Sequence, residues 1–163
     1  MMRRASPADA EDIAKIYNQA MKVGVFATPQ VTPVTREERL AWLGDHQDPF
    51  PAFVCESGDG KVIAWCSLSK FSARPEYTGI AEISRYVDEK FREHGLGKLM
   101  LAHLIEAAES FGLRALVSRA IDRNVGSIRG STHFGFHQVA LLHESSRIRG
   151  EWFNEVWLWK KLV

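Results

Sequence analysis

Two closely spaced glycines stand where a long helix is predicted to begin, in the stretch FREHGLGKLMLAHLIEAAESFG of residues 91–112. Arg92, Gly95 and Gly97 follow the spacing R-x-x-G-x-G, and apolar residues recur after them at helical intervals. Glycine disfavours a helix and has no side chain, so this start leaves backbone N–H groups bare. Such groups, at the positive end of a helix dipole, bind anions such as phosphate. The spacing is also compatible with a tight strand–helix turn that binds nothing.

Two common phosphate-binding motifs are absent from this turn. The dinucleotide fingerprint requires a third glycine where this chain has Met100. The G-x-x-x-x-G-K-[ST] loop of nucleotide-binding proteins does not occur either. Arg92, His94 and Lys98 would add positive potential around the turn. The turn therefore indicates a phosphate-bearing cofactor other than NAD or ATP.

Length and composition favour a single globular domain over residues 1–163. Apolar residues make up 45% of the chain, charged residues 25%, and the formal net charge is +1. Basic and acidic residues are interspersed, which indicates no nucleic-acid surface. No apolar run is long enough for a membrane span, and the start MMRRASPADAED lacks the apolar centre of a signal peptide. We therefore expect a cytoplasmic protein with no membrane partner.

Cysteine and histidine spacing argues against a metal site. Cys55 and Cys66 form no C-x-x-C pair and lie in the apolar, strand-like runs AFVCE and VIAWCSL. We expect both to be buried, reduced thiols. The six histidines show neither H-E-x-x-H nor mixed Cys/His ligand spacing, so no metal is predicted.

The elements around the glycine turn predict a mixed α/β fold. Ser6 is expected to cap a first helix that runs to Met21, and Thr35 with Glu38 forms a capping-box pattern for a second. The turn SGDG predicts a hairpin between the strands AFVCE and KVIAWCSLSKF. Further strands are expected at residues 80–88, 114–121, 137–145 and 155–162, and further helices up to Gly112 and over residues 124–134. This order indicates a parallel crossover in an otherwise antiparallel arrangement, unlike a doubly wound dinucleotide fold.

The glycine turn, set between a strand and a long helix, resembles the acetyl-CoA pyrophosphate turn of the GNAT N-acetyltransferases. The segments AEISRYVDEKFREHGLGKLML and IDRNVGSIRGSTHFGF resemble the core of the branch that acetylates phosphinothricin and methionine sulfoximine. The segments RRASPADAEDIAKIYNQA, FSARPEY and GEWFNEVWLWKKL resemble its opening, its substrate loop and its last strand. The resemblance therefore extends over nearly the whole chain, with several motifs in the same order.

This resemblance implies a GNAT fold, with a central, mostly antiparallel sheet flanked by about four helices. Two parallel strands, here Ile80–Val87 and Arg114–Ile121, would splay apart, and the pantetheine arm of acetyl-CoA would fill the gap between them. The resemblance places the following residues at the cofactor: Arg85, Tyr86 and Val87 along the arm, Arg92, Glu93, His94, Gly95, Leu96, Gly97 and Lys98 at the pyrophosphate, and Asn124 and Ser127 beside the arm. Asn124 would also serve as an ordinary helix cap.

The resemblance assigns catalysis to Glu82, as the base that takes a proton from the attacking amine through water. Without it, the run AEIS indicates only an ordinary strand. A backbone N–H near Val87 would stabilise the oxyanion. Ser131 stands where the branch usually has a histidine that protonates the departing thiolate, and Tyr86 or His133 could replace it. Glu93 replaces a frequent glycine of the turn.

The substrate loop of the branch maps onto Arg74, Pro75, Glu76 and Tyr77. Arg74 would hold a substrate carboxylate, although an exposed loop arginine has the same pattern. Phe26, Tyr77 and Trp152 would wall the pocket or belong to the core. The implied reaction is acetylation of the α-amine of a small amino acid or analogue.

Other acceptors remain open, namely a polyamine, an aminoglycoside or a protein N-terminus, as does a non-catalytic acyl-CoA sensor. The resemblance also implies a homodimer. The C-terminal run VWLWKKL is one possible contact surface, and a buried edge strand would have the same pattern.

Overall fold

A computed structural model describes residues 1–163, and a seven-stranded sheet forms its centre. The strands are β1 (Met2–Arg4), β2 (Ala52–Glu56), β3 (Val62–Lys70), β4 (Ile80–Val87), β5 (Ala115–Ile121), β6 (His137–Ile148) and β7 (Glu151–Lys161). They lie in the order β1-β2-β3-β4-β5-β7-β6. Every neighbouring pair is antiparallel except β4 and β5, which are parallel. The predicted mixed α/β fold with one parallel pair is confirmed.

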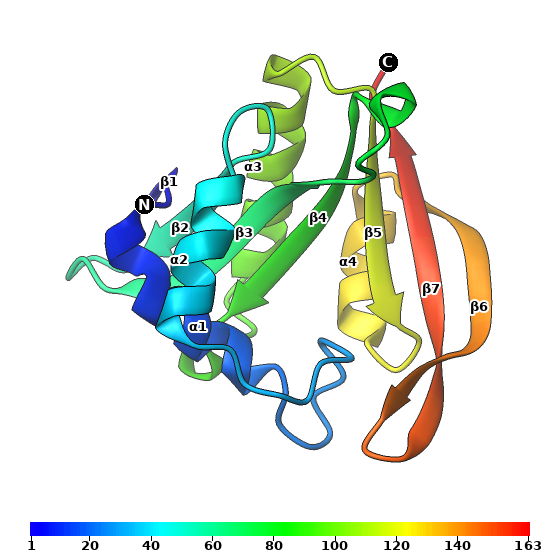
Figure 1. Ribbon diagram of the computed structural model, residues 1–163, viewed down its shortest axis with the longest axis horizontal. Coiled ribbons are helices and arrows are strands. Elements are labelled where there is room, and N and C mark those ends of the chain that lie inside the picture. Colours follow the sequence, from blue (N-terminus) through cyan, green and yellow to red (C-terminus); the bar gives the residue numbers. More distant parts are fainter.

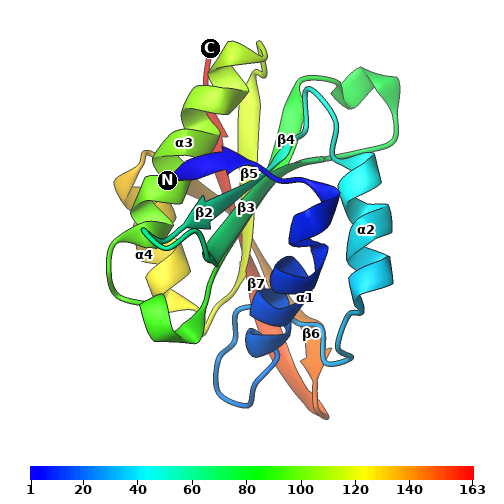
Figure 2. The ribbon, with the colours of Figure 1, turned by 90° about the vertical axis from the view of Figure 1, so that its left-hand side faces the viewer.

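Helices cover both faces of the sheet (Figures 1 and 2). They are α1 (Ala10–Gln19), α2 (Arg36–Asp45), α3 (Leu96–Ser110) and α4 (Val125–His133), with short 3-10 turns at Pro7–Asp9, Pro75–Tyr77 and Glu89–Phe91. The helices α1 and α2 pack on one face around Ile13 and Trp65. The helix α3 packs on the opposite face, where Met100 and Leu104 are fully buried against the sheet. The helices α1, α2 and α3 thus bury apolar residues at the helical spacing that the sequence predicted, whereas the one buried residue of α4 is Ser131.

The first helix begins later than Ser6. The Asp9 carboxylate accepts hydrogen bonds from the backbone N–H of Ser6 at 2.7 Å and from its hydroxyl at 3.0 Å. Ser6 is nonetheless the N-cap residue, as predicted, of the 3-10 turn Pro7–Asp9, and this turn leads directly into α1. The second helix begins as predicted, since Thr35 and Glu38 form both hydrogen bonds of the capping box.

The parallel strands β4 and β5 pair over only part of their length. Their register joins Ile80 to Ala115 and continues through Glu82 and Val117, where the pairing stops. Both strands continue beyond that point, and Figure 1 shows them diverging. They form a wedge with its apex at Glu82 and its open end at Val87. The predicted splay is confirmed.

The C-terminal run VWLWKKL lies inside the sheet, because β7 is flanked by β5 and β6. Val156 and Leu158 are 5% and 1% exposed. The idea that this run forms an edge strand is wrong, and β6 is the edge. Cys55 and Cys66 are confirmed as buried free thiols. None of the helices has both the length and the hydropathy that crossing a membrane requires.

Candidate active site

A cleft of about 960 Å³ opens where β4 and β5 part. Its walls come from α1 and the α1–α2 connection, β4, the turn before α3 and the start of α3, β5, α4 and one residue of β7, Glu155. The volume is that of a site for a drug-sized ligand or larger. The splayed strand edges leave backbone groups inside it that no neighbouring strand pairs.

The turn before α3 presents a row of free backbone donors to this cleft. The N–H groups from Arg92 to Gly97 donate to no carbonyl of the chain, and the first such bond of the helix is from Lys98 to the carbonyl of Gly95, at 3.0 Å. Gly95 has φ of 78°, a conformation that requires glycine. Gly97 has no such constraint, and a Cβ added there would meet nothing within 4 Å. The fold therefore does not explain the missing side chain of Gly97, whereas a bound anion would.

The charged residues of the turn lie around these donors. Glu93 is exposed and has φ of 67°, which is strained for a residue other than glycine. Arg92 lines the cleft and its Nε donates to the carbonyl of Val87 at 3.4 Å. Lys98 also lines the cleft. His94 does not, since its ring bonds the carbonyl of Arg92 at 2.7 Å outside the cleft.

Glu82 lies at the apex of the wedge and belongs to a charged network. The guanidinium of Arg119 on β5 lies 3.4 Å from the carboxylate of Glu82 and 3.0 Å from the carboxylate of Glu155 on β7. Burial alone would lower the pKa of Arg119, but its hydrogen bond to Glu155 and the two carboxylate charges raise that pKa. Arg119 therefore stays charged and holds Glu82 at the cleft wall.

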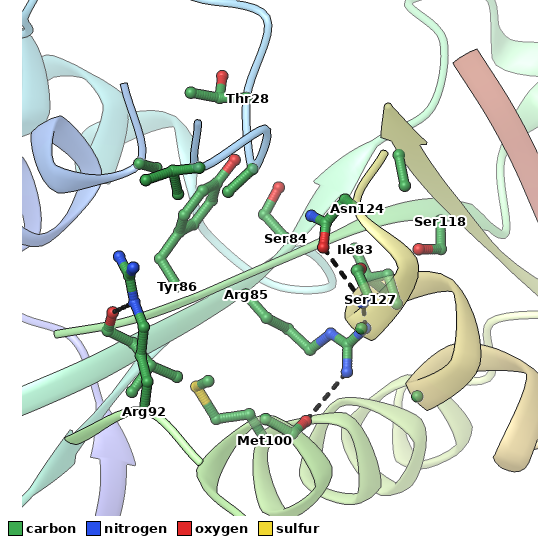
Figure 3. A pocket seen from close by; sticks show the side chains of 18 of the residues that line it. Thr28, Ile83, Ser84, Arg85, Tyr86, Arg92, Met100, Ser118, Asn124 and Ser127 are labelled. Atoms are coloured by element: carbon green, nitrogen blue, oxygen red, sulfur yellow. Dashed lines mark hydrogen bonds between the residues drawn. The ribbon is translucent and has the colours of Figure 1, made fainter. Parts of the chain in front are cut away.

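Tyr86 lies on the same sheet face as Glu82 and points towards α1 (Figure 3). Its ring packs edge-on against Tyr17, with ring centroids 4.9 Å apart. It also packs at a tilt against Trp65, with centroids 4.7 Å apart. Burial raises the pKa of the Tyr86 phenol well above its usual range. Tyr17 in turn bonds the Thr28 hydroxyl at 3.0 Å, which fixes the α1–α2 connection over the cleft.

Arg85 points the opposite way, between α3 and α4 (Figure 3). Its guanidinium donates to the Gly97 carbonyl at 3.0 Å, the Ser131 hydroxyl at 3.0 Å and the Ser127 hydroxyl at 3.5 Å. Burial lowers the pKa of Arg85 to about 10. Asn124 caps α4, because its Oδ1 accepts from the Ser127 N–H at 3.2 Å, as the helix-cap interpretation predicted.

Residues 2–157 match the acetyltransferase (GNAT) domain family. The chain belongs to this family. Within it, an L-methionine sulfoximine/L-methionine sulfone acetyltransferase from Pseudomonas aeruginosa is 29% identical over 154 residues, which cover 94% of this chain and 89% of that protein.

Two solved GNAT structures superpose closely on the chain. Ribosomal-protein-alanine N-acetyltransferase from Brucella melitensis has a TM-score of 0.94 at 29% identity, with 99% of each chain covered. A phosphinothricin acetyltransferase from Sinorhizobium meliloti in complex with acetyl-CoA has a TM-score of 0.92 at 25% identity, with 99% of this chain and 88% of that chain covered. The resemblance to a GNAT acetyltransferase of this branch is confirmed.

The structure places the predicted GNAT substrate loop away from the cleft. None of Arg74, Pro75, Glu76 and Tyr77 lines it, and Tyr77 is 43% exposed. Phe26 packs against Phe153 with ring centroids 5.4 Å apart, although its neighbours Val25 and Ala27 do line the cleft. Trp152 is 56% exposed. Substrate binding by these residues stays a prediction.

Several residues of the GNAT cleft carry no signal in the sequence. The ion pairs of Arg119 with Glu82 and with Glu155 depend on the register of three strands, which a single sequence does not specify. Tyr17 and Thr28 come from a helix stripe and a proline-rich connection, and both have the composition of ordinary core or loop residues. Arg85 was predicted for its backbone, while its side chain occupies the cleft wall.

Proposed function

We propose that this GNAT enzyme transfers the acetyl group of acetyl-CoA to the α-amine of a small amino acid or analogue. Methionine sulfoximine, methionine sulfone and phosphinothricin represent the acceptor class. The observation that carries the proposal is the row of free N–H donors from Arg92 to Gly97, at the open end of a wedge whose apex holds Glu82. The relative named for methionine sulfoximine and the neighbour bound to acetyl-CoA support it.

The residues of the cleft suit acetyl-CoA as a substrate. The N–H row and the side chains of Arg92 and Lys98 would bind the diphosphate. The pantetheine arm carries two amides, which would pair with the free edge of β4 as a short peptide strand does. Val87 lies five positions after Glu82, about 16 Å along the strand, so an extended arm would bring the thioester to the apex.

The chemistry proposed is direct attack in a ternary complex. An α-amine with a pKa near 8 is mostly protonated at neutral pH, so Glu82 would remove a proton through water. The amine nitrogen then bonds the thioester carbonyl carbon, and the electron pair of the breaking C–S bond goes to sulfur. An unpaired backbone N–H of β4 beside the apex would stabilise the oxyanion, because the N–H of Val87 lies at the other end of the wedge. The amine nitrogen loses a second proton after its attack. That proton reaches the CoA thiolate through water and gives the free thiol, while the first proton passes from Glu82 to solvent.

A second acceptor class is a protein N-terminus. The close structural neighbour named for ribosomal-protein alanine supports it, since its acceptor is also an α-amine. A panel that holds free amino acids, their sulfoximine and sulfone analogues and a short alanine-led peptide would separate the two. Preference for the peptide would move the proposal to this second class.

The mechanism is tested with Glu82→Gln, measured by release of the CoA thiol. We expect kcat/KM to fall about 100-fold or more, with acetyl-CoA binding retained, because a neutral amide accepts no proton from the amine. The matched control is Glu106→Gln, an exposed carboxylate on α3 away from the cleft, which should leave turnover unchanged. Normal turnover by Glu82→Gln would remove Glu82 from the mechanism. Tight acetyl-CoA binding with no turnover on the whole panel would instead indicate a sensor.

We further propose that two copies assemble as a homodimer. The strand β6 supports this, because it lies at the sheet edge and exposes apolar side chains, among them Val139 at 52% and Leu141 at 40%.

A further inference from the structure

Arg85 carries a positive charge into the wall of the wedge, and no carboxylate of the chain pairs with it. Its three acceptors, the Gly97 carbonyl and the hydroxyls of Ser127 and Ser131, are all uncharged. A guanidinium taken from water without a counter-charge is costly, so such an arginine usually meets an anion. The anion that completes this site must therefore come from outside the chain.

The space around the guanidinium is kept free of other side chains. A Cβ added at Gly130 would lie 3.9 Å from Nη1 of Arg85, in van der Waals contact with the guanidinium. Ser131 is fully buried beneath it. The two small residues of α4 thus leave room for one large cation beside the cleft.

The contacts of Arg85 extend its charge towards the apex. Its Nη2 donates to the Ser131 hydroxyl at 3.0 Å, and that hydroxyl donates to the Ser118 hydroxyl at 3.4 Å. Ser118 follows Val117, the last residue of β5 that pairs with β4. The row of hydrogen bonds therefore ends where the wedge closes, on the sheet face opposite Glu82.

Acetyl transfer brings two kinds of anion to the wedge, the diphosphate and the leaving thiolate. The diphosphate already has the free N–H row at the open end. The sulfur must lie near the apex, because the amine that attacks the thioester passes its proton to Glu82 there. We propose that Arg85, extended by the hydroxyl of Ser131, stabilises the CoA thiolate as it departs.

This role rests on the proposed function. It accounts for the departure of the thiolate, for which the sequence analysis named no single residue. As the C–S bond breaks, its electron pair becomes the lone pair of a thiolate. A guanidinium does not release its proton at neutral pH, so Arg85 acts by charge and leaves the proton to come from water. A serine hydroxyl is a weak acid but a good hydrogen-bond donor. The Ser131 hydroxyl can therefore help to stabilise the thiolate, and no histidine or tyrosine is needed at position 131.

The experiment measures the thiol pKa of CoA bound to the enzyme, by the ultraviolet absorbance of the thiolate as pH rises. The complex with desulfo-CoA, which lacks the sulfur, is the blank for the protein's own groups. In the wild type we expect the thiol of bound CoA to titrate about one pH unit below the thiol of free CoA, a tenfold shift. Arg85→Met should abolish this shift, and Arg85→Lys should keep part of it. Equal thiol pKa values in the wild type and Arg85→Met would overturn the proposal.

Kinetics give a second readout. Arg85→Met should lower kcat for acetyl transfer about 10- to 100-fold, with a smaller change in KM for acetyl-CoA, because the charge acts only after the C–S bond begins to break. Arg36→Met, which removes an exposed arginine outside the cleft, is the control and should change neither constant. If kcat/KM fell by the same factor through a change in KM alone, Arg85 would only bind the coenzyme. That result would overturn its role in leaving-group departure.

Two further outcomes separate this inference from the proposed function. If CoA does not bind the wild type in calorimetry, the proposed function fails and this role with it. If CoA binds with an unshifted thiol pKa, only this role fails. Should Arg85→Met not fold, Ser131→Ala takes its place, since it cuts the extension but keeps the guanidinium, and about half of the pKa shift should disappear.

Discussion

Gly97 is the residue at which the needs of the fold and of the ligand separate most clearly. Gly95 must be glycine for its backbone conformation, whereas Gly97 lies in the first turn of α3 with ordinary helical geometry. No atom of the chain occupies the space where its Cβ would stand. An alanine there is therefore compatible with the fold and incompatible only with something that touches the backbone.

Gly97→Ala should stabilise the free protein and weaken coenzyme binding. Alanine is the better helix former, so we expect the free energy of unfolding to rise by about 0.5 kcal/mol. The added methyl group would keep a phosphate from the N–H row, so CoA affinity should fall at least about tenfold, or 1.4 kcal/mol. Chemical denaturation and calorimetry with CoA measure the two effects.

Gly44→Ala is the matched control for this change. Gly44 lies in α2, outside the cleft, and its Cβ would also meet nothing within 4 Å. It should give a similar gain in stability with unchanged CoA affinity. Unchanged affinity in Gly97→Ala as well would contradict the placement of the diphosphate on this turn.

Among the elements, the N-terminal strand is joined to the first helix by one charged cluster. Arg3 on β1 donates to both carboxylate oxygens of Asp9, at 2.8 and 2.7 Å, and its Nε donates to Glu56 on β2 at 2.8 Å. Asp9 is 4% exposed. The hydrogen bonds from Arg3 outweigh the effect of burial and lower the pKa of the Asp9 carboxyl.

This lowered pKa gives the cluster a pH dependence with a definite sign. The folded state holds Asp9 ionised at pH values where the unfolded chain, with a pKa near 3.9, already binds a proton. The stabilisation is therefore complete above about pH 4 and is lost as pH falls through the folded pKa. Asp9→Asn should cost about 2 kcal/mol at pH 7, because it removes charge-assisted hydrogen bonds.

Denaturation curves between pH 7 and pH 2 test this expectation. The difference between wild type and Asp9→Asn should begin to narrow below about pH 4, where the unfolded wild-type chain binds a proton at Asp9, and should level off once pH falls below the lowered folded pKa. Glu11→Gln, an exposed carboxylate in the first turn of α1, is the control and should run parallel to the wild type. A constant difference across the whole range would show that Asp9 does not titrate as stated.

Sequence patterns predicted the elements well where a local signal decides them. The capping box at Thr35, the hairpin around Gly58 and the glycine start of α3 all depend on residues within one turn. The cap at Ser6 was predicted, but the 3-10 geometry of Pro7–Asp9 was not, because the same residues also suit the first turn of an α-helix. The place of β7 was missed because strand order depends on contacts between distant segments. Caps and turns can be predicted from neighbouring residues in the sequence, whereas the order of strands in the sheet cannot.

At the scale of the whole molecule, the two-sided sheet gives the wedge two chemically different walls. Glu82 and Arg119 face the α1 side, while Arg85 and Ser131 face α3 and α4. The motifs predicted the cofactor turn, since its glycines are contiguous in sequence. The partners of Glu82 and the charge of Arg85 could not be predicted, because alternation along β4 and its register with β5 decide which wall each side chain joins.

The sheet also ends in an uncovered strand, from which the expected homodimer can be argued. The strand β6 is twelve residues long, pairs only with β7, and leaves Val139, Leu141 and Leu142 between 38% and 52% exposed. An edge strand with free backbone groups and apolar side chains pairs readily with another strand. A second copy of β6 across a two-fold axis satisfies both copies with the same residues.

The double variant Val139→Lys/Leu141→Lys tests this contact, because charges on an edge strand oppose its pairing with another copy. In sedimentation velocity we expect the wild type to run as a dimer of the 18.4 kDa chain and the variant as a monomer. The variant should keep its CoA affinity, since both residues lie outside the cleft. The matched control is Val23→Lys, an 82% exposed valine beyond the end of α1, which should leave the dimer intact. A wild type that sediments as a monomer at all concentrations would exclude the dimer, and a dimer that survives in the double variant would place its interface elsewhere.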